Sequence, residues 1–306
     1  MQTSYESEVL SLCRELVRRP SLSGQEGAAA DLVAEEMAML GYDHVARDDL
    51  GSVIGVMTGE STGPTVLIDA HLDVVPAISP ESWTRPPFAG LSENGAIWGR
   101  GVVDTKGSLA AAVPAVAALG RRGMRGTLVM SASVGEEMVE GLALGYILDR
   151  CAPDMVVICE PTGLRLGIGH KGRCGLVLTT QGVAAHSSRP EAGVNAVYRM
   201  LDAVSRVRAI PLPHDELLGR GVNELVEIVS SPYPGTSMVP EGCTTRFDRR
   251  LVRGETRDSV LEELHDALRG LDGLSVAYHR AELTTYTGRT FIVEDFHPAW
   301  AMGEDI

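Results

Sequence analysis

Histidine and carboxylate side chains follow several apolar segments of the sequence, at positions where strands would end. They are His71 and Asp73 after TVLIDA, Asp104 in GRGVVDTKG, the pair Glu136 and Glu137, and Glu160 after MVVIC. Ligands usually bind at the carboxyl ends of the strands of a layered α/β sheet. We therefore expect these side chains to lie close together at one edge of a sheet.

The residue types in this set are those of a hydrolytic metal site. Imidazole and carboxylate donors without thiolate suit zinc, cobalt or manganese. His71 and Asp73 alternate on an extended segment and point the same way, so the carboxylate can orient the imidazole. Adjacent Glu136 and Glu137 can face different directions, which supplies a general base and a metal ligand together. The more specific prediction is a centre that binds two metal ions.

Each of these features also has an ordinary structural interpretation. A lone histidine beside an apolar run is more often a hydrogen-bonded core residue, and two adjacent glutamates more often begin a solvated helix. The joint occurrence of these residues after successive strands favours the metal site.

Short β-rich segments alternate with helical ones over the first half of the chain, which is typical of a sheet covered by helices. The continuously apolar runs TVLIDA and MVVICE predict central strands with both faces covered. The tetrapeptide SGQE at 23–26 has the form of a capping box and predicts a helix start. From about residue 170 the pattern predicts a compact α+β module with two helices on one face of an antiparallel sheet.

The composition argues against several classes of protein. The 306 residues include 27 Lys and Arg against 41 Asp and Glu, a net charge of −14 that repels nucleic acids and anionic membranes. We find no run of about 18 apolar residues that would predict a membrane span. Five widely spaced cysteines without a C-x-x-C motif favour reduced thiols. We therefore expect a cytoplasmic protein with a small-molecule substrate and no nucleic-acid or membrane partner.

Five ordered motifs resemble one family of enzymes. They are LIDAHLDVVP, GRGVVDTKGSLAA, GEEMVEG, CEPTG and AAHSSRPEAGVNA. Together they resemble the zinc amidohydrolases and peptidases that include acetylornithine deacetylase, succinyl-diaminopimelate desuccinylase, aminoacylase and carboxypeptidase. Within this family, EPTGLRLGIGHKGR, DRRLVRGET and TYTG are most similar to the branch named for selenium-metabolism hydrolases.

The resemblance implies an α/β fold with two parts. One is a zinc-peptidase-like catalytic domain with a covered central sheet, and the other is an inserted α+β dimerisation domain. Residues 1–169 would form the first part of the catalytic domain and 170–282 the dimerisation or lid domain. Residues 283–306 would start the return into the catalytic domain.

The resemblance also implies two zinc ions per subunit, with Co²⁺ or Mn²⁺ as possible replacements. The metal-binding residues that it implies are His71, Asp104, Glu137 and Glu160. The first zinc would be held by His71, Asp104 and Glu160, and Asp104 would bridge to a second zinc bound by Glu137. A cis peptide bond between Asp104 and Thr105 is a further implication.

Further residues acquire roles in catalysis and substrate binding from the same resemblance. Glu136 would be the general base, and Asp73 would orient the metal-binding imidazole. His186 would reach into the active site of a partner subunit and stabilise the developing oxyanion, which implies a homodimer. Arg250 would contact a substrate carboxylate, with Arg249 beside it as the alternative.

Compared with the family, the chain is expected to be C-terminally truncated. The returning segment of the family carries the last metal-binding histidine, so the second metal site is expected to be incomplete and a sheet edge uncovered. His297 stands where the family has an aromatic residue that is not a ligand, and we do not assign it to the metal.

These observations predict a homodimeric zinc-dependent amidohydrolase or metallopeptidase of the deacylase or dipeptidase type. It would cleave an amide bond of an N-acyl amino acid or a small peptide through a metal-activated water. The alternative is a catalytically impaired, truncated remnant that acts only as a dimerising or binding protein. A hydrolase of cyclic or carbamoyl nitrogen compounds is a second rival within the family.

Overall fold

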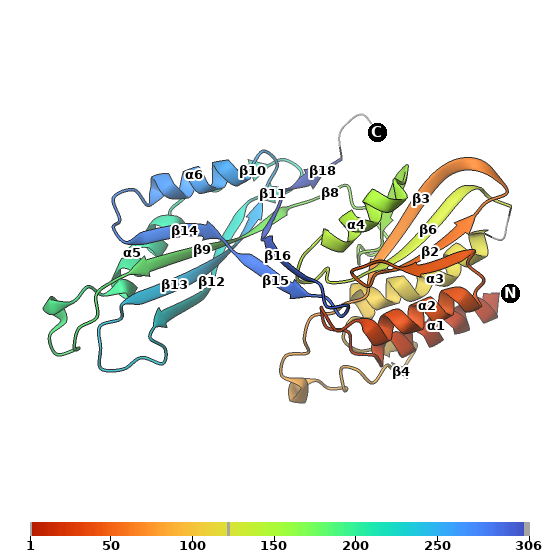
Figure 1. Cartoon of the computed structure of the whole chain (residues 1–306), viewed down its shortest axis with the longest axis horizontal. Helices are drawn as coiled ribbons and strands as arrows, with labels where there is room; N and C mark the ends of the chain where they lie inside the picture. Colours follow the sequence, from red (N-terminus) through yellow and green to blue (C-terminus); the bar gives the residue numbers. More distant parts are fainter. Residues whose placement is uncertain (1, 121–122, 303–306) are drawn as a thin grey trace. The chain divides into compact units, whose positions relative to one another are not determined.

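The computed structural model describes residues 2–120 and 123–302. They form two compact units, and Figure 1 shows the elements of each. The first unit consists of Met1–Arg165 with Glu282–Ile292, and the second of Leu166–Ala281 with Val293–Ile306. The chain thus leaves the first unit near the expected limit of 169 and returns near 282. Residues 293–302 belong to the second unit, whereas the sequence assigned 283–306 to the return into the first.

The first unit contains a five-stranded sheet in the order β1-β2-β6-β3-β7. These strands are β1 (His44–Arg47), β2 (Val53–Thr58), β6 (Arg125–Ser133), β3 (Ser61–His71) and β7 (Met155–Ile158). β3 runs parallel to both β6 and β7, and β2 runs antiparallel to β6. The carboxyl ends of β3, β6 and β7 therefore lie at the same edge of the sheet.

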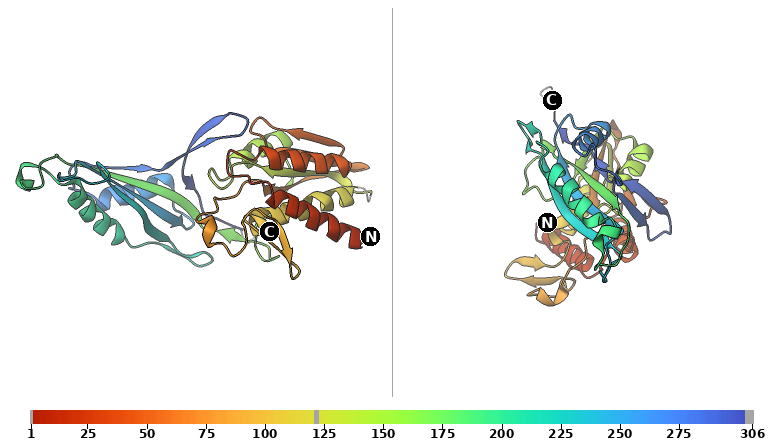
Figure 2. Two further views of the ribbon diagram at one scale, coloured as in Figure 1. Left: turned by 90° about the horizontal axis from the view of Figure 1, so that it is seen from below. Right: turned by 90° about the vertical axis from the view of Figure 1, so that its left-hand side faces the viewer.

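Helices cover both faces of this sheet, so the α/β class is confirmed (Figures 1 and 2). The helices are α1 (Gln2–Val17), α2 (Gly27–Met39), α3 (Gly107–Gly120) and α4 (Leu142–Cys151). The main core joins buried residues of α1, α2 and α3 to the sheet. A smaller cluster joins Leu67 of β3 and Val129 of β6 to Ile147 of α4. Burial of alternate residues of β3 on opposite faces explains the continuous apolar run TVLIDA.

The prediction of two central strands is right for β3 and wrong for MVVICE. β7 is an edge strand, and its four residues Met155–Ile158 are 41–58% exposed. An apolar run records the hydrophobicity of a segment but not its place in the sheet. Among the described residues, β7 pairs with β3 on one side and leaves its other side open.

The stretch Val102–Gly120 is long and apolar enough to cross a membrane by length and composition alone. Core helices pass the same test. In this structure Leu109, Val113 and Val116 of α3 lie within the main core of the first unit. α3 is therefore a core helix of the first unit.

The capping box predicted for SGQE is absent. α2 begins at Gly27, and its N-cap residue Glu26 has helical backbone angles and no side-chain cap hydrogen bond. The Ser23 hydroxyl donates instead to Asp73 Oδ2 at 2.6 Å, and Glu26 accepts from the Gly24 and Gly135 amides. Tertiary partners have replaced the local hydrogen bonds that the pattern predicts.

The second unit is built on an antiparallel sheet in the order β12-β13-β9-β14. The strands are β12 (Val222–Ser231), β13 (Gly242–Leu251), β9 (Gly172–Gln181) and β14 (Leu274–Tyr278), and β17 (Phe296–His297) also pairs with β9. α5 (Ala196–Arg208) and α6 (Arg257–Ala267) share one buried cluster with this sheet. The predicted α+β module is confirmed, with both helices packed on the same face.

A hairpin of β15 (Arg280–Thr284) and β16 (Thr290–Glu294) leads the chain back to the first unit. Its turn is anchored there because the Tyr286 hydroxyl donates to the Gly51 carbonyl at 2.6 Å. The remaining elements are η1 (Pro80–Ser82), β4 (Leu91–Glu93), β5 (Ala96–Trp98), η2 (Val102–Lys106), β8 (Gly169–His170), η3 (Pro190–Ala192), β10 (His214–Asp215), β11 (Gly219–Arg220) and β18 (Trp300–Ala301).

Substitution of Arg249 by Met tests a buried ion pair in the second unit. The Arg249 side chain is 2% exposed and bonds to Glu255 and Glu263, of which Glu255 is 9% exposed. Removing the guanidinium leaves a buried carboxylate without its counter-charge, so the free energy of unfolding should fall by about 3–5 kcal/mol. Urea denaturation followed by circular dichroism measures this loss.

Arg250→Met is the matched control. The Arg250 side chain is 48% exposed and pairs with Asp248, so its replacement should change the free energy of unfolding by less than about 1 kcal/mol. Equal losses for the two variants would contradict the structural role of Arg249.

Candidate metal centre

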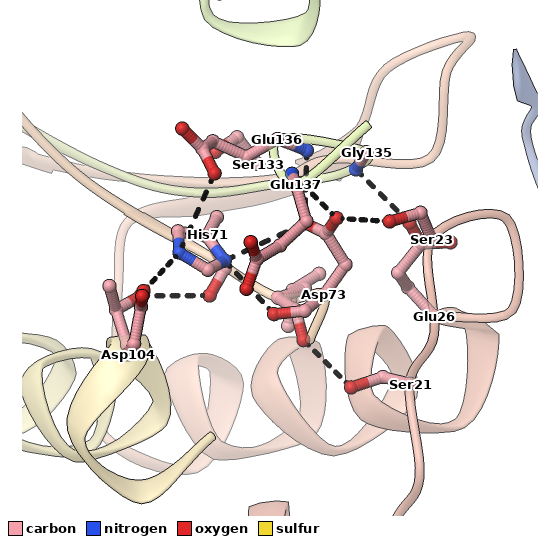
Figure 3. Close-up of polar contacts among 12 residues, drawn as sticks. Ser21, Ser23, Glu26, His71, Asp73, Asp104, Ser133, Gly135, Glu136 and Glu137 are labelled. Atoms are coloured by element: carbon pink, nitrogen blue, oxygen red, sulfur yellow. Dashed lines mark hydrogen bonds and ion pairs between the residues drawn. The ribbon is translucent and has the colours of Figure 1, made fainter. Parts of the chain in front are cut away.

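The residues singled out in the first unit meet at one edge of the central sheet, and Figure 3 shows His71, Asp73, Asp104, Glu136 and Glu137 there. His71 ends β3 and Asp73 follows it, while Glu136 and Glu137 follow β6 and Glu160 follows β7. Asp104 lies in η2, directly before α3. Three parallel strands, β3, β6 and β7, deliver their following segments to the same place, which is why residues far apart in sequence converge.

His71 is the centre of this cluster. Its Nε2 atom lies 2.9 Å from Asp104 Oδ1 and 3.8 Å from both Glu136 Oε2 and Glu160 Oε1. One ligand atom each of His71, Asp104 and Glu137 lie within 4.8 Å of one another. The imidazole is therefore within a few ångströms of every carboxylate proposed as a ligand or base.

The imidazole is buried and the carboxylates opposite it are open to solvent. The His71 side chain is 2% exposed, whereas those of Asp104, Glu136 and Glu160 are 36–54% exposed. This gives a fixed nitrogen donor on the protein side and oxygen donors that a bound molecule can reach.

Asp73 is fully buried beside His71, and it orients the following glutamate loop as well as the imidazole. His71 Nδ1 lies 2.9 Å from the Asp73 backbone carbonyl and 3.6 Å from its carboxylate. The carboxylate accepts hydrogen bonds from the backbone N–H groups of Glu136 and Glu137, each at 3.0 Å, and from the Ser23 hydroxyl. Asp73 thus fixes both the imidazole and the loop that carries the two glutamates.

The electrostatics of the cluster fit a bound cation. Burial raises the pKa of Glu136 to about 8 against the opposing effect of His71, and neighbouring carboxylates raise it further. Burial and nearby carboxylates also raise the pKa of Glu137 and of Glu160. Crowded carboxylates with hard oxygen donors and one imidazole are a donor set for a divalent metal ion.

His71 responds to the same negative surroundings. Burial alone would lower the pKa of its imidazole, but Asp73, Glu136 and Glu160 together raise it to about 10. Burial opposes ionisation of Asp73, yet bonding to His71 and Ser23 holds the pKa of its carboxyl below its usual value. Without a metal ion, the imidazole is therefore protonated at neutral pH, and a metal ion would have to displace this proton.

η2 is fixed by a buried lysine that the sequence interpretation did not single out. Lys106 is fully buried, and its ammonium donates to the carbonyls of Leu16 in the last turn of α1 and of Arg19 just after it, both at 2.9 Å. Burial lowers the pKa of Lys106 to about 8. The Asp104–Thr105 peptide bond is cis, as the resemblance implies.

Two of the residues singled out belong to the second unit. His186 is exposed between β9 and α5, and its Nδ1 atom lies 2.8 Å from the Ser188 hydroxyl. Arg250 lies on β13, where its Nε forms an ion pair with Asp248 Oδ1 at 2.9 Å. Arg249 points to the opposite face and is occupied by Glu255 and Glu263, which removes it as the alternative substrate contact.

Comparison with known proteins identifies the family. A model of "Peptidase family M20/M25/M40" matches residues 67–301, which include His71, Asp104, Glu136, Glu137 and Glu160. The chain belongs to the peptidase family M20/M25/M40. The family membership, together with the donor set described above, indicates a metal-dependent hydrolase.

Similar proteins and similar solved structures cover most of the chain. It is 31% identical to the uncharacterized protein YgeY of Escherichia coli K12, over 98% of this chain and 76% of that protein. It is also 31% identical to a succinyl-diaminopimelate desuccinylase of Xanthobacter autotrophicus, over 89% of this chain and 75% of that enzyme. The Bacillus subtilis YXEP protein, a dinuclear metal-binding M20 peptidase, has a similar fold, with a TM-score of 0.66 at 14% identity over 99% of this chain and 77% of that one.

Zinc binding to the metal-free protein should release at least one proton. His71 is protonated below a pKa of about 10, and a ligating imidazole must be neutral. Raising the pH through the neutral range makes this proton easier to remove, so the apparent association constant for zinc should rise about tenfold per pH unit. Isothermal titration calorimetry in two buffers with different ionisation enthalpies counts the released protons.

The control for this titration is His71→Asn. This variant should bind zinc more weakly, and the number of protons released should fall by about one. Zinc binding that is independent of pH in the unaltered protein would rule out His71 as a ligand.

Proposed function

We propose that this protein hydrolyses an amide bond of an N-acyl amino acid or a small peptide with a free carboxylate. The observation that carries the proposal is the convergence of His71, Asp104, Glu136, Glu137 and Glu160 at one sheet edge. The desuccinylase relative supports an N-acyl substrate.

We assign the resident metal as zinc, in two sites that share Asp104. The first would use His71, Asp104 and Glu160, and the second Asp104 and Glu137, with Co²⁺ or Mn²⁺ as substitutes. When bound, the metal supplies polarisation of the amide carbonyl and a lowered pKa of water. Asp104 lies close both to His71 and to Glu137, which supports a paired centre that shares this carboxylate.

Glu136 is proposed as the general base. Its carboxylate accepts a proton from the attacking water and returns it to the leaving amine. Asp73 holds the backbone N–H groups of Glu136 and Glu137, so base and ligand are fixed as a pair. A base held this way does not have to be oriented again in each turnover.

His186 and Arg250 are proposed to act on the substrate. His186 would donate a hydrogen bond to the developing oxyanion in the partner subunit, and Arg250 would bind the substrate carboxylate. Arg250 is 48% exposed, so its guanidinium can leave Asp248 for a substrate.

The proposed homodimer is supported by the edge of the second sheet. β12 pairs with β13 on one side, and Val222, Val226, Ile228 and Val229 along it are 40–52% exposed. An unpaired edge strand with apolar side chains is suited to pairing with a second copy. We also propose a cytoplasmic location, which the five free cysteines support.

Glu136→Gln tests the proposed reaction. The amide keeps the size of the side chain but cannot accept the proton of water, so kcat should fall by about 10³-fold. Metal content, measured by elemental analysis, should stay at that of the unaltered protein. Turnover is measured on a panel of N-acetyl and N-succinyl amino acids and dipeptides.

Glu35→Gln, at an exposed position on α2, is the matched control and should retain full turnover. Stoichiometric metal without turnover on any substrate of the panel would favour the impaired, dimerising remnant instead. Turnover on cyclic or carbamoyl nitrogen compounds alone would move the substrate class to that rival.

Ile228→Asp tests the proposed dimer. A charge on the exposed edge of β12 should weaken pairing with a second copy and shift the protein toward monomer. Ile292→Asp, at an exposed isoleucine of β16, is the control and should leave the mass unchanged. Analytical ultracentrifugation reports both masses, and a monomeric unaltered protein would contradict the proposal.

A further inference from the structure

Three consecutive backbone N–H groups of the loop after β6 are held by two buried carboxylates. Glu136 and Glu137 donate to the two oxygens of Asp73. The preceding residue, Gly135, donates to Glu26 Oε1 at 3.1 Å (Figure 3). Glu26 is fully buried and stands 109 residues away from Gly135 in the sequence. The first of the three bonds therefore depends on Glu26 alone.

Glu26 has no evident role in its own helix. It is the N-cap residue of α2, but its side chain makes no cap hydrogen bond. Its Oε1 also accepts from the Gly24 amide at 3.0 Å, and its Oε2 has no hydrogen-bond partner among the described residues. The side chain therefore links the Ser23–Glu26 segment to the loop that carries Glu136.

A buried carboxylate without a cation is unfavourable for stability. Burial raises the pKa of Glu26 to about 7, against the opposing hydrogen bonds from the Gly24 and Gly135 amides. An apolar residue at this position would avoid the desolvation but would leave the Gly135 N–H without its acceptor. A glutamate at position 26 is thus explained by its hydrogen bond to the Gly135 amide and not by packing in the core.

The backbone at Gly135 has little freedom to find another acceptor. Its φ is +70°, and a Cβ atom there would come within 2.4 Å of the Leu283 side chain on β15. The loop is thus confined between the returning hairpin and Glu26. A change at Glu26 would therefore alter the backbone direction of the loop that carries Glu136 and Glu137 more than the packing of the core.

We propose that Glu26 is a positioning residue, whose hydrogen bond to Gly135 sets the direction of the Glu136 and Glu137 side chains at the metal centre. This inference rests on the proposed function, because it assigns Glu136 as base and Glu137 as ligand. Asp73 and Glu26 together form a second layer of carboxylates behind the first. Glu26 neither binds the metal nor contacts the substrate.

Three substitutions separate hydrogen bonding from charge. Glu26→Gln keeps a carbonyl acceptor at the same reach, Glu26→Leu removes the acceptor, and Glu26→Asp retracts the carboxylate by one methylene. We expect Gln to retain kcat within about threefold, while Leu and Asp lower kcat by at least about tenfold with KM within about twofold. Retained kcat in the Glu26→Gln protein would show that the hydrogen-bond acceptor matters and the negative charge does not.

A second readout does not depend on turnover. Hydrogen exchange of the Gly135 amide in the metal-free protein should be at least about tenfold faster in the Leu and Asp variants and unchanged in Gln. Zinc affinity should follow the same order, since Glu137 is a ligand. If the unaltered protein proves inactive on every substrate, the proposed function fails, and these two measurements still decide the role of Glu26.

Asp48 provides the matched control. It is also a buried carboxylate, its Oδ1 accepts from the amides of Leu50, Gly51 and Ser52, and its Oδ2 has no partner among the described residues. It lies between β1 and β2 and does not bond to the Gly135 loop. Asp48→Leu should destabilise the protein without changing kcat, Gly135 exchange or zinc affinity.

Two results would overturn the inference. One is a Glu26→Leu protein, folded by circular dichroism, with unchanged Gly135 exchange and unchanged kcat. The other is a Glu26→Gln protein that loses as much kcat as Leu, since an acceptor at the same reach would then not suffice. If the Glu26→Leu protein fails to fold, the Glu26→Asp protein takes its place in both comparisons.

Discussion

The central constraint of this protein is the concentration of carboxylates around one buried imidazole. Asp104, Glu136 and Glu160 approach His71 Nε2 to within 4 Å, and Asp73 lies behind the same ring. Burial and mutual repulsion raise the pKa values of Glu136 and Glu160. The negative carboxylates raise the pKa of His71 against the opposing effect of its burial. A divalent cation relieves this repulsion, so the arrangement that is unfavourable in the metal-free protein is the one that makes a metal centre.

Such a centre requires a support that does not yield to the repulsion. Parallel strands bring His71, Glu136 and Glu160 to one edge, and Lys106 ties the segment bearing Asp104 to the end of α1. Behind them, Asp73 accepts the backbone N–H groups of the glutamate loop. The segments that carry Asp104, Glu136 and Glu137 are thus held by hydrogen bonds behind the carboxylates.

The two units illustrate different uses of charge. In the second unit, Arg249 is buried with Glu255 and Glu263 as a structural ion pair, while the adjacent Arg250 remains exposed. Alternation along β13 separates the two arginines, because successive side chains of a strand face opposite sides of the sheet. A sequence that shows only two neighbouring arginines cannot distinguish them, whereas the sheet assigns one to the core and the other to solvent.

The sequence by itself determined the α/β class, the α+β module and the set of acidic and histidine residues, because hydrophobic periodicity and the motifs after each strand are local. It did not determine that Met155–Ile158 is an edge strand, since a run of apolar residues is the same at the edge and at the centre. Nor did it show that Ser23 and Glu26 turn away from α2. A local capping bond and a tertiary bond to Asp73 or Gly135 use the same oxygens, and only the folded chain, which brings residues about 50 and 109 positions apart together, decides between them.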